Sequence, residues 1–178
     1  LALVRPLVVL DVETDGYGRP EESRVVELGF KVMYHDARQS IEWVSLVNPG
    51  RPIKPYASKH IHHITDERMH GCRVCGQLQD GHEEVALQFQ CSEFKPIPTF
   101  AQVARKLARG FTDCDFCGYS VEFDLAVLAS EFERADVAWS RAGAYVFDPL
   151  ALWRAMARRR LEDAVREYAG VWLCSEDR

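Results

Sequence analysis

The stretch LVVLDVETDG, residues 7–16, decides the fold, because an apolar run there ends in two carboxylates. Residues 7–12 predict a central strand. Strand side chains alternate between faces, so Asp11 and Glu13 should point to the same face at the strand end. A divalent cation that prefers oxygen ligands, Mg²⁺ or Mn²⁺, would offset their repulsion. An ordinary solvated strand end is the alternative.

The composition is that of a soluble globular domain. The 178 residues suffice for one domain, with 47% hydrophobic and 28% charged residues. These fractions exclude collagen-like, low-complexity and wholly disordered chains. A formal charge of −5 argues against a long basic clamp on duplex nucleic acid but allows a small acidic metal pocket. Because no apolar run approaches the ~20 residues of a membrane span and no signal peptide is evident, we expect a cytoplasmic protein without membrane contact.

Apolar periodicity and turn residues outline an α/β fold with a mixed sheet. Early strands close in sequence suggest an antiparallel meander. Predicted strands cover residues 7–12, 25–34, 41–47, 115–119 and 144–147, and predicted helices cover 56–62, 101–110, 122–134, about 149–159 and 161–169.

A third acid, Asp124, follows the strand predicted at residues 115–119, in the first turn of the next helix. Sites in open α/β sheets lie at the carboxyl ends of strands, near a switch in strand order. The helix dipole also favours an acid at this position. A simple helix-start acid is the alternative.

Four segments together resemble one protein family. They are DVETDG (11–16), VNPGRPIKPYASKHIHHITDE (47–67), GYSVEFDLAVLASEFER (118–134) and YVFDPLALWRAMARRRLEDAVREYAG (145–170). In this order they resemble the motifs of the DEDD 3′–5′ exonucleases, a family that includes the proofreading subunit of bacterial DNA polymerase III and ribonuclease T. The resemblance implies a ribonuclease-H-like fold, with a mixed five-stranded sheet flanked by helices.

The resemblance also implies a chemistry. Two Mg²⁺ or Mn²⁺ ions would drive hydrolysis of phosphodiester bonds at the 3′ end of single-stranded DNA or RNA. Asp11, Glu13 and Asp124 would be the metal ligands, and Thr14, His62 and Phe123 would line the pocket of the terminal nucleotide. A helix-end histidine and a core phenylalanine are the plain alternatives for the last two. A polymerase or another protein is an expected partner.

The chain departs from the family at its C-terminal end. The family's fourth carboxylate, preceded five residues earlier by a His or Tyr, is not found, so we expect the catalytic C-terminal segment to be missing from this sequence. A rival alignment makes Asp163 the fourth acid but places Arg158 as the base, and Arg does not deprotonate water near neutral pH. The alternative function is a catalytically incomplete module that binds nucleic acid or a protein. Ser120 also replaces the family's usual Asn.

A cysteine-rich stretch interrupts the pattern. Residues 68–96 change character, and residues 71–95 are predicted as an insertion within the single domain. Cys72, Cys75, His82 and Cys91 could hold a structural Zn²⁺, with His70 as a substitute for His82. A flexible loop with free thiols is the alternative. Cys117 is predicted to be a small buried core residue.

Elemental analysis tests the zinc site. Protein purified without chelator should carry about one equivalent of zinc, because four N and S ligands form a closed tetrahedral site. The substitution Cys72→Ser should release the metal and expose residues 71–95 to protease. Zinc well below one equivalent, or a Cys72→Ser protein that keeps its zinc, contradicts the assignment.

Overall fold

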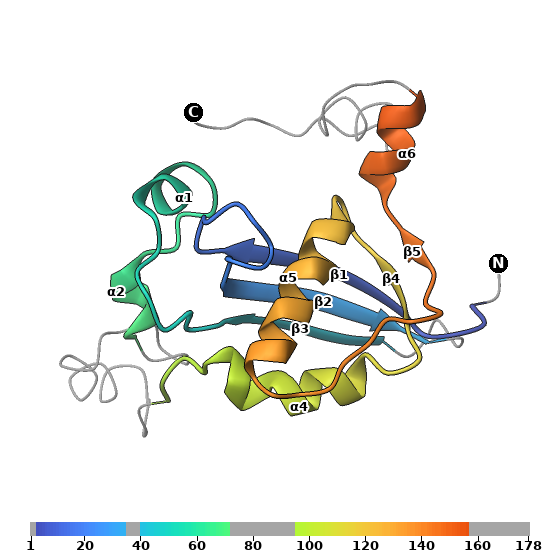
Figure 1. Ribbon diagram of the computed structural model, residues 1–178, viewed down its shortest axis with the longest axis horizontal. Coiled ribbons are helices and arrows are strands. Elements are labelled where there is room, and N and C mark those ends of the chain that lie inside the picture. Colours follow the sequence, from blue (N-terminus) through green and yellow to red (C-terminus); the bar gives the residue numbers. More distant parts are fainter. Residues whose placement is uncertain (1–2, 35–39, 72–94, 157–178) are drawn as a thin grey trace.

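A five-stranded mixed sheet forms the centre of the protein (Figure 1). The computed structural model describes residues 3–34, 40–71 and 95–156. The strands are β1 (Leu7–Thr14), β2 (Val25–Met33), β3 (Ser40–Leu46), β4 (Asp115–Cys117) and β5 (Val146–Phe147), in the order β3-β2-β1-β4-β5. β1, β2 and β3 form the expected antiparallel meander, and β4 and β5 continue the sheet parallel to β1. The predicted α/β class is therefore confirmed.

The strand ends differ from the predicted ones for local reasons. β1 continues to Thr14, because its carboxyl end stays paired with β2, across an irregularity between Glu13 and Thr14. β4 stops at Cys117 rather than residue 119, because the chain turns at once into the next helix. β4 and β5 are short strands at one side of the sheet. Strands of two or three residues are too short for apolar alternation to mark where they end.

Five helices are described: α1 (Pro55–His60), α2 (Asp66–Met69), α4 (Phe100–Gly110), α5 (Val121–Arg134) and α6 (Pro149–Met156). The sequence did not predict α2, whose four residues are too few to show a helical period. The sequence feature that marks its start is the N-cap residue Thr65, whose hydroxyl accepts the N–H of Arg68 at 3.4 Å. The helix predicted at residues 161–169 lies outside the described residues. Among the described helices, none is long and apolar enough to cross a membrane.

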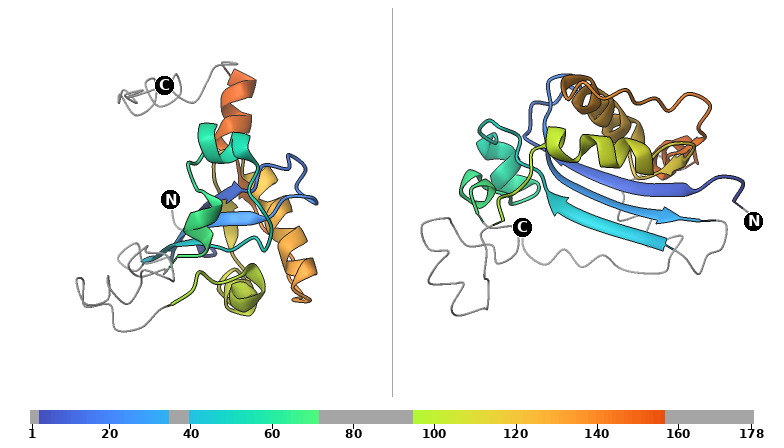
Figure 2. Two further views of the ribbon diagram at one scale, coloured as in Figure 1. Left: turned by 90° about the vertical axis from the view of Figure 1, so that its left-hand side faces the viewer. Right: turned by 90° about the horizontal axis from the view of Figure 1, so that it is seen from below.

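The main core lies between one face of the sheet and the helices α4 and α5 (Figures 1 and 2). Alternate β1 residues Val8, Leu10 and Val12 point into it, as the period of a strand requires. Leu125 and Phe132 of α5 pack against them and are almost fully buried. Burying each such side chain contributes roughly 1.5–3 kcal/mol, which makes this layer the main source of stability.

The core cysteine is Cys114, so the prediction for Cys117 was wrong. Cys114 is 3% exposed and belongs to the main core, just before β4. Cys117 is only half-buried, because the intervening Phe116 takes the core-facing position and alternation turns Cys117 to the other face. Burial raises the pKa of both thiols.

A second, smaller core anchors α1 and α2. Its buried residues are Val26, Ile53, Ala57, Ile64, Met69 and Ile97. Met69 lies at the start of the stretch 68–96, which looks irregular in the sequence, and Ile97 follows that stretch directly, so both flanks pack into this core. Figure 1 shows α1 near the end toward which β1 runs. This core therefore holds residues 53–64 close to the acids of β1.

Gly118 brings the start of α5 against β1. A Cβ atom at this position would lie 2.4 Å from the Leu10 carbonyl oxygen and 3.2 Å from the side chain of Val121. Real Cβ atoms do not approach a backbone oxygen so closely, so only glycine fits without a shift. The close contact fixes where α5 begins relative to β1.

The substitution Gly118→Ala should lower the free energy of unfolding by about 1–3 kcal/mol, the usual cost of forcing atoms into a packed region. The matched control is Gly110→Ala, because a Cβ at Gly110 in α4 would meet nothing within 4 Å. Alanine favours a helix over glycine by about 1 kcal/mol, so the control should be neutral or stabilising. Urea unfolding measures both, and equal losses would contradict the close-contact argument.

Candidate active site

The two acids of β1 lie in its carboxyl-terminal half, two positions apart and so on the face that strand alternation predicts. Asp11 is exposed and pairs in register with Gly29, whereas Glu13 is half-buried opposite Glu27. Burial raises the pKa of Glu13, and the charges of Asp11 and Glu27 raise it further. Glu13 therefore stands among like charges in a partly desolvated place.

Asp124 joins this group from the first turn of α5. It is 5% exposed, and its Oδ2 atom is buried without a hydrogen-bond partner. Burial raises its pKa to about 7, with further contributions from the charges of Asp11, Glu13 and Asp148. The sheet and α5 thus bring the three predicted acids within electrostatic range. Within the described ranges, however, no three His, Cys, Asp or Glu side chains are close enough to hold a metal ion as they stand.

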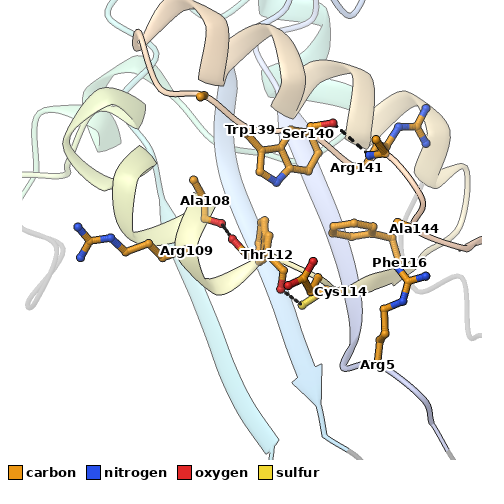
Figure 3. Close-up of a pocket in the computed structure, with 14 residues that line it drawn as sticks. Arg5, Ala108, Arg109, Thr112, Cys114, Phe116, Trp139, Ser140, Arg141 and Ala144 are labelled. Atoms are coloured by element: carbon orange, nitrogen blue, oxygen red, sulfur yellow. Dashed lines mark hydrogen bonds between the residues drawn. The ribbon is translucent and has the colours of Figure 1, made fainter.

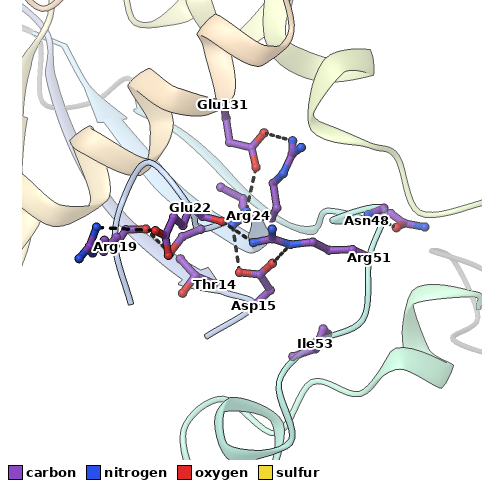
Figure 4. A network of polar contacts seen from close by, with 12 residues as sticks. Thr14, Asp15, Arg19, Glu22, Arg24, Asn48, Arg51, Ile53 and Glu131 are labelled. Carbon is purple, nitrogen blue, oxygen red and sulfur yellow. Dashed lines mark hydrogen bonds and ion pairs between the residues drawn. The ribbon is translucent and has the colours of Figure 1, made fainter. Parts of the chain in front are cut away.

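Asp15, the acid that follows β1, is buried in a different way. It is 0% exposed, yet both of its oxygens are used (Figure 4). One accepts the backbone N–H of Arg24 at 3.1 Å, and the other pairs with the guanidinium of Arg51. A buried carboxylate is tolerated when it is paired and hydrogen-bonded in this way.

Glu131 of α5 is the second paired example (Figure 4). It is 3% exposed, and its Oε1 accepts the backbone N–H of Val25 at 3.1 Å. Arg24 lies 3.4 Å and Arg134 3.3 Å from its carboxylate oxygens. Both acids therefore tie the loop after β1 to the body of the protein. Of the buried carboxylates that the structure describes, Asp124 is the one with an oxygen lacking a partner.

The sequence reasoning missed Asp148. Its Oδ1 accepts the backbone N–H groups of Leu150 at 2.8 Å and Ala151 at 3.4 Å, at the start of α6. The same atom accepts the N–H of Ser120 at 3.0 Å. An Asp before a Pro at the first position of a helix is a recognisable N-cap signal. The link to Ser120 joins residues 28 apart and has no signal in the sequence.

The three residues predicted to line a nucleotide pocket differ in their contacts: Thr14 and His62 are hydrogen-bonded to each other, whereas Phe123 packs against the core. The Thr14 carbonyl lies 3.0 Å from Nε2 of His62, and Nδ1 of His62 accepts the N–H of Ile64 at 3.0 Å. Since Nδ1 is an acceptor, Nε2 carries the proton and donates it to Thr14. Phe123 is half-buried next to Asp124 and packs at the edge of the main core. Both ring nitrogens of His62 are thus used inside the protein.

The predicted zinc ligands Cys72, Cys75, His82 and Cys91 lie outside the described residues, as do Arg158 and Asp163. The substitute ligand His70 is described, and it is exposed with Nδ1 2.9 Å from the carbonyl oxygen of Asp66. The zinc site and the rival fourth acid therefore stay predictions.

A cavity of about 320 Å³ lies at the opposite end of the sheet. Arg5 before β1, Thr112 before β4 and Trp139 after α5 line it (Figure 3). Asp11, Glu13 and Asp124 are not among its lining residues. The cavity is thus separate from the cluster of acids.

Comparisons with known proteins agree with this architecture. No family model and no curated protein sequence matches the chain. Among solved structures it is similar to E. coli Exonuclease I in complex with a dA16 oligonucleotide, with a TM-score of 0.54 and 19% sequence identity. The chain has an exonuclease-like fold. The match covers 85% of this chain but 29% of the Exonuclease I chain.

Ser120, at the start of α5, has a strained backbone. Its φ of 64° and ψ of 27° are left-handed, and its side chain makes no capping hydrogen bond. Asn tolerates this conformation better than Ser. The serine therefore stores local strain at the turn that carries Asp124.

We expect Ser120→Gly to raise the free energy of unfolding by about 0.5–1 kcal/mol, because it removes left-handed strain. The matched control is Ser130→Gly in the interior of the same helix, where glycine should lower stability by about 0.5–1 kcal/mol. Urea unfolding distinguishes the two signs. Equal destabilisation by both glycines would show that the strain is absent.

Proposed function

We propose that this chain is a metal-dependent 3′–5′ exonuclease domain that hydrolyses phosphodiester bonds at the 3′ end of single-stranded DNA or RNA. The observation that carries the proposal is the state of Asp124. A buried carboxylate oxygen without a partner, beside two further acids, is costly unless something positive binds there. Strongly shifted pKa values of this kind gather at functional sites. The exonuclease-like fold gives the site its chemical context.

The donor set suits Mg²⁺ or Mn²⁺. Asp11, Glu13 and Asp124 offer hard carboxylate oxygens, the ligands that these cations prefer. Two such ions supply an activated water and stabilise the leaving oxygen in phosphodiester hydrolysis. The side chains must close in to reach ligating distances, and a cation would lower the repulsion that opposes this closure.

The neighbouring residues suit a strand end in this site. Phe123 has a ring that can stack on a base without reading its identity. His62 holds the carbonyl of Thr14, and so fixes the strand end where the terminal nucleotide would lie. Exonuclease I was solved with a dA16 oligonucleotide, and a strand of adenines alone does not form Watson–Crick pairs with itself, which supports a single strand as the substrate proposed here.

A second function is favoured by one observation. In the part of the chain that the structure describes, no three metal-ligating side chains are gathered at binding distance. This favours a module with an incomplete metal site that binds nucleic acid or a protein partner, such as a polymerase, without hydrolysis. The two functions differ in turnover, so one assay separates them.

Asp11→Asn should lower metal-dependent shortening of a 5′-labelled single strand by about 10²–10³-fold, the usual cost of removing one electrostatic stabiliser. The matched control, Asp136→Asn, removes the same charge from an exposed position after α5 with a left-handed φ of 53°. Asparagine accepts that conformation, so the control should keep full activity and stability.

The product pattern tests direction. A 3′–5′ enzyme gives a ladder from 5′-labelled DNA or RNA and single labelled nucleotides from 3′-labelled substrate. Undiminished cleavage by Asp11→Asn places the chemistry elsewhere. Tight binding of the strand by the unchanged protein, with Mn²⁺ present but no turnover, supports the second function instead.

A further inference from the structure

One carboxylate oxygen links the starts of two helices. Asp148 Oδ1 caps α6 through the N–H groups of Leu150 and Ala151, at 2.8 and 3.4 Å. It also receives the N–H of Ser120, at 3.0 Å, the residue before α5. Asp124 lies four residues after Ser120, in the first turn of α5. The bond from Ser120 therefore ties the turn that carries Asp124 to the start of α6.

Three features indicate that the hydrogen bond between Ser120 and Asp148 helps to hold the turn before Asp124 in place. Ser120 holds a left-handed conformation and its own side chain does not cap α5. β4 and β5 pair for only two residues before the chain reaches Asp148. The charge of Asp148 also acts on Asp124, so holding the two close together has an electrostatic cost. A contact that is kept despite strain and repulsion needs a stabilising contribution, and three hydrogen bonds to one acceptor oxygen supply it.

We propose that Asp148 is a positioning residue for Asp124: its Oδ1 holds the N–H of Ser120 and thereby sets the first turn of α5 toward the acids of β1. The inference rests on the proposed function, since the purpose of the placement is cation binding by Asp11, Glu13 and Asp124. The working feature is the acceptor atom at Oδ1. The negative charge is dispensable, and Asp148 does not itself ligate the cation.

Three substitutions separate these roles. Asp148→Asn keeps an acceptor oxygen at the same place and loses the charge. Asp148→Ser keeps a good N-cap for α6, but its shorter side chain cannot also reach Ser120. Asp148→Ala loses both contacts. Thr99→Ala is the matched control, because it removes the N-cap of α4, whose hydroxyl takes part in a capping box away from the acids.

The first measurement is the affinity of each protein for Mn²⁺, without nucleic acid, determined by titration calorimetry. Partners that orient ligands typically change metal affinity 10–100-fold, so we expect about a tenfold loss in Asp148→Ser and Asp148→Ala. Asp148→Asn should stay within about threefold of the unchanged protein, and Thr99→Ala should lose stability but not affinity. The second measurement is hydrogen exchange of the Ser120 amide, which should quicken about tenfold in Asp148→Ser and not in Asp148→Asn.

Each contrary outcome overturns a specific part. If Asp148→Asn loses as much affinity as Asp148→Ala, the charge or direct ligation matters and the positioning role is wrong. If Asp148→Ser matches the unchanged protein in both measurements, Asp148 only caps α6. If the unchanged protein binds no Mn²⁺, the proposed function fails on its own. The exchange rate of the Ser120 amide then still decides whether Asp148 holds the turn.

Discussion

The backbone at Gly118 lies so close to β1 that a Cβ atom there would be 2.4 Å from the Leu10 carbonyl oxygen. This contact sets the distance between the end of β4 and the centre of β1, and α5 begins three residues later. Because β4 runs parallel to β1 and its last residue, Cys117, pairs with Val9, the chain leaves β4 beside Leu10, next to Asp11. Because Gly118 has no side chain, α5 can begin close to β1, and this places Asp124 near Asp11 and Glu13.

The buried acids near β1 fall into two groups, one with partners for both oxygens and one without. Asp15 and Glu131 are buried but paired with arginines and backbone N–H groups, and they stabilise the loop that follows β1. Asp124 is buried with an unpartnered oxygen and a pKa of about 7. The first arrangement holds the fold together, whereas the second costs stability. Such a cost is the observation on which the proposed function rests.

Much of the architecture could be predicted from local pattern. The sequence predicts the strand at residues 7–12, the helix at residues 101–110 and the strand-to-helix turn before Asp124. Patterns failed where elements were short: α2 has four residues and β5 has two. They also failed for Cys117, because Phe116 takes the core-facing position of β4 and alternation turns Cys117 to the other face.

The sequence by itself determined which residues could do chemistry and on which face of β1 two of them lie, because alternation along a strand is a local property. Only the tertiary structure shows that Asp124 lies within electrostatic range of that pair, that Asp15 pairs with Arg51 and Glu131 with Arg24, and that Asp148 bonds to Ser120. These facts depend on interactions between residues far apart in the sequence, such as Arg24 with Glu131, 107 positions apart. No local pattern encodes such contacts, since they follow from how the strands order themselves and how closely α5 packs on the sheet.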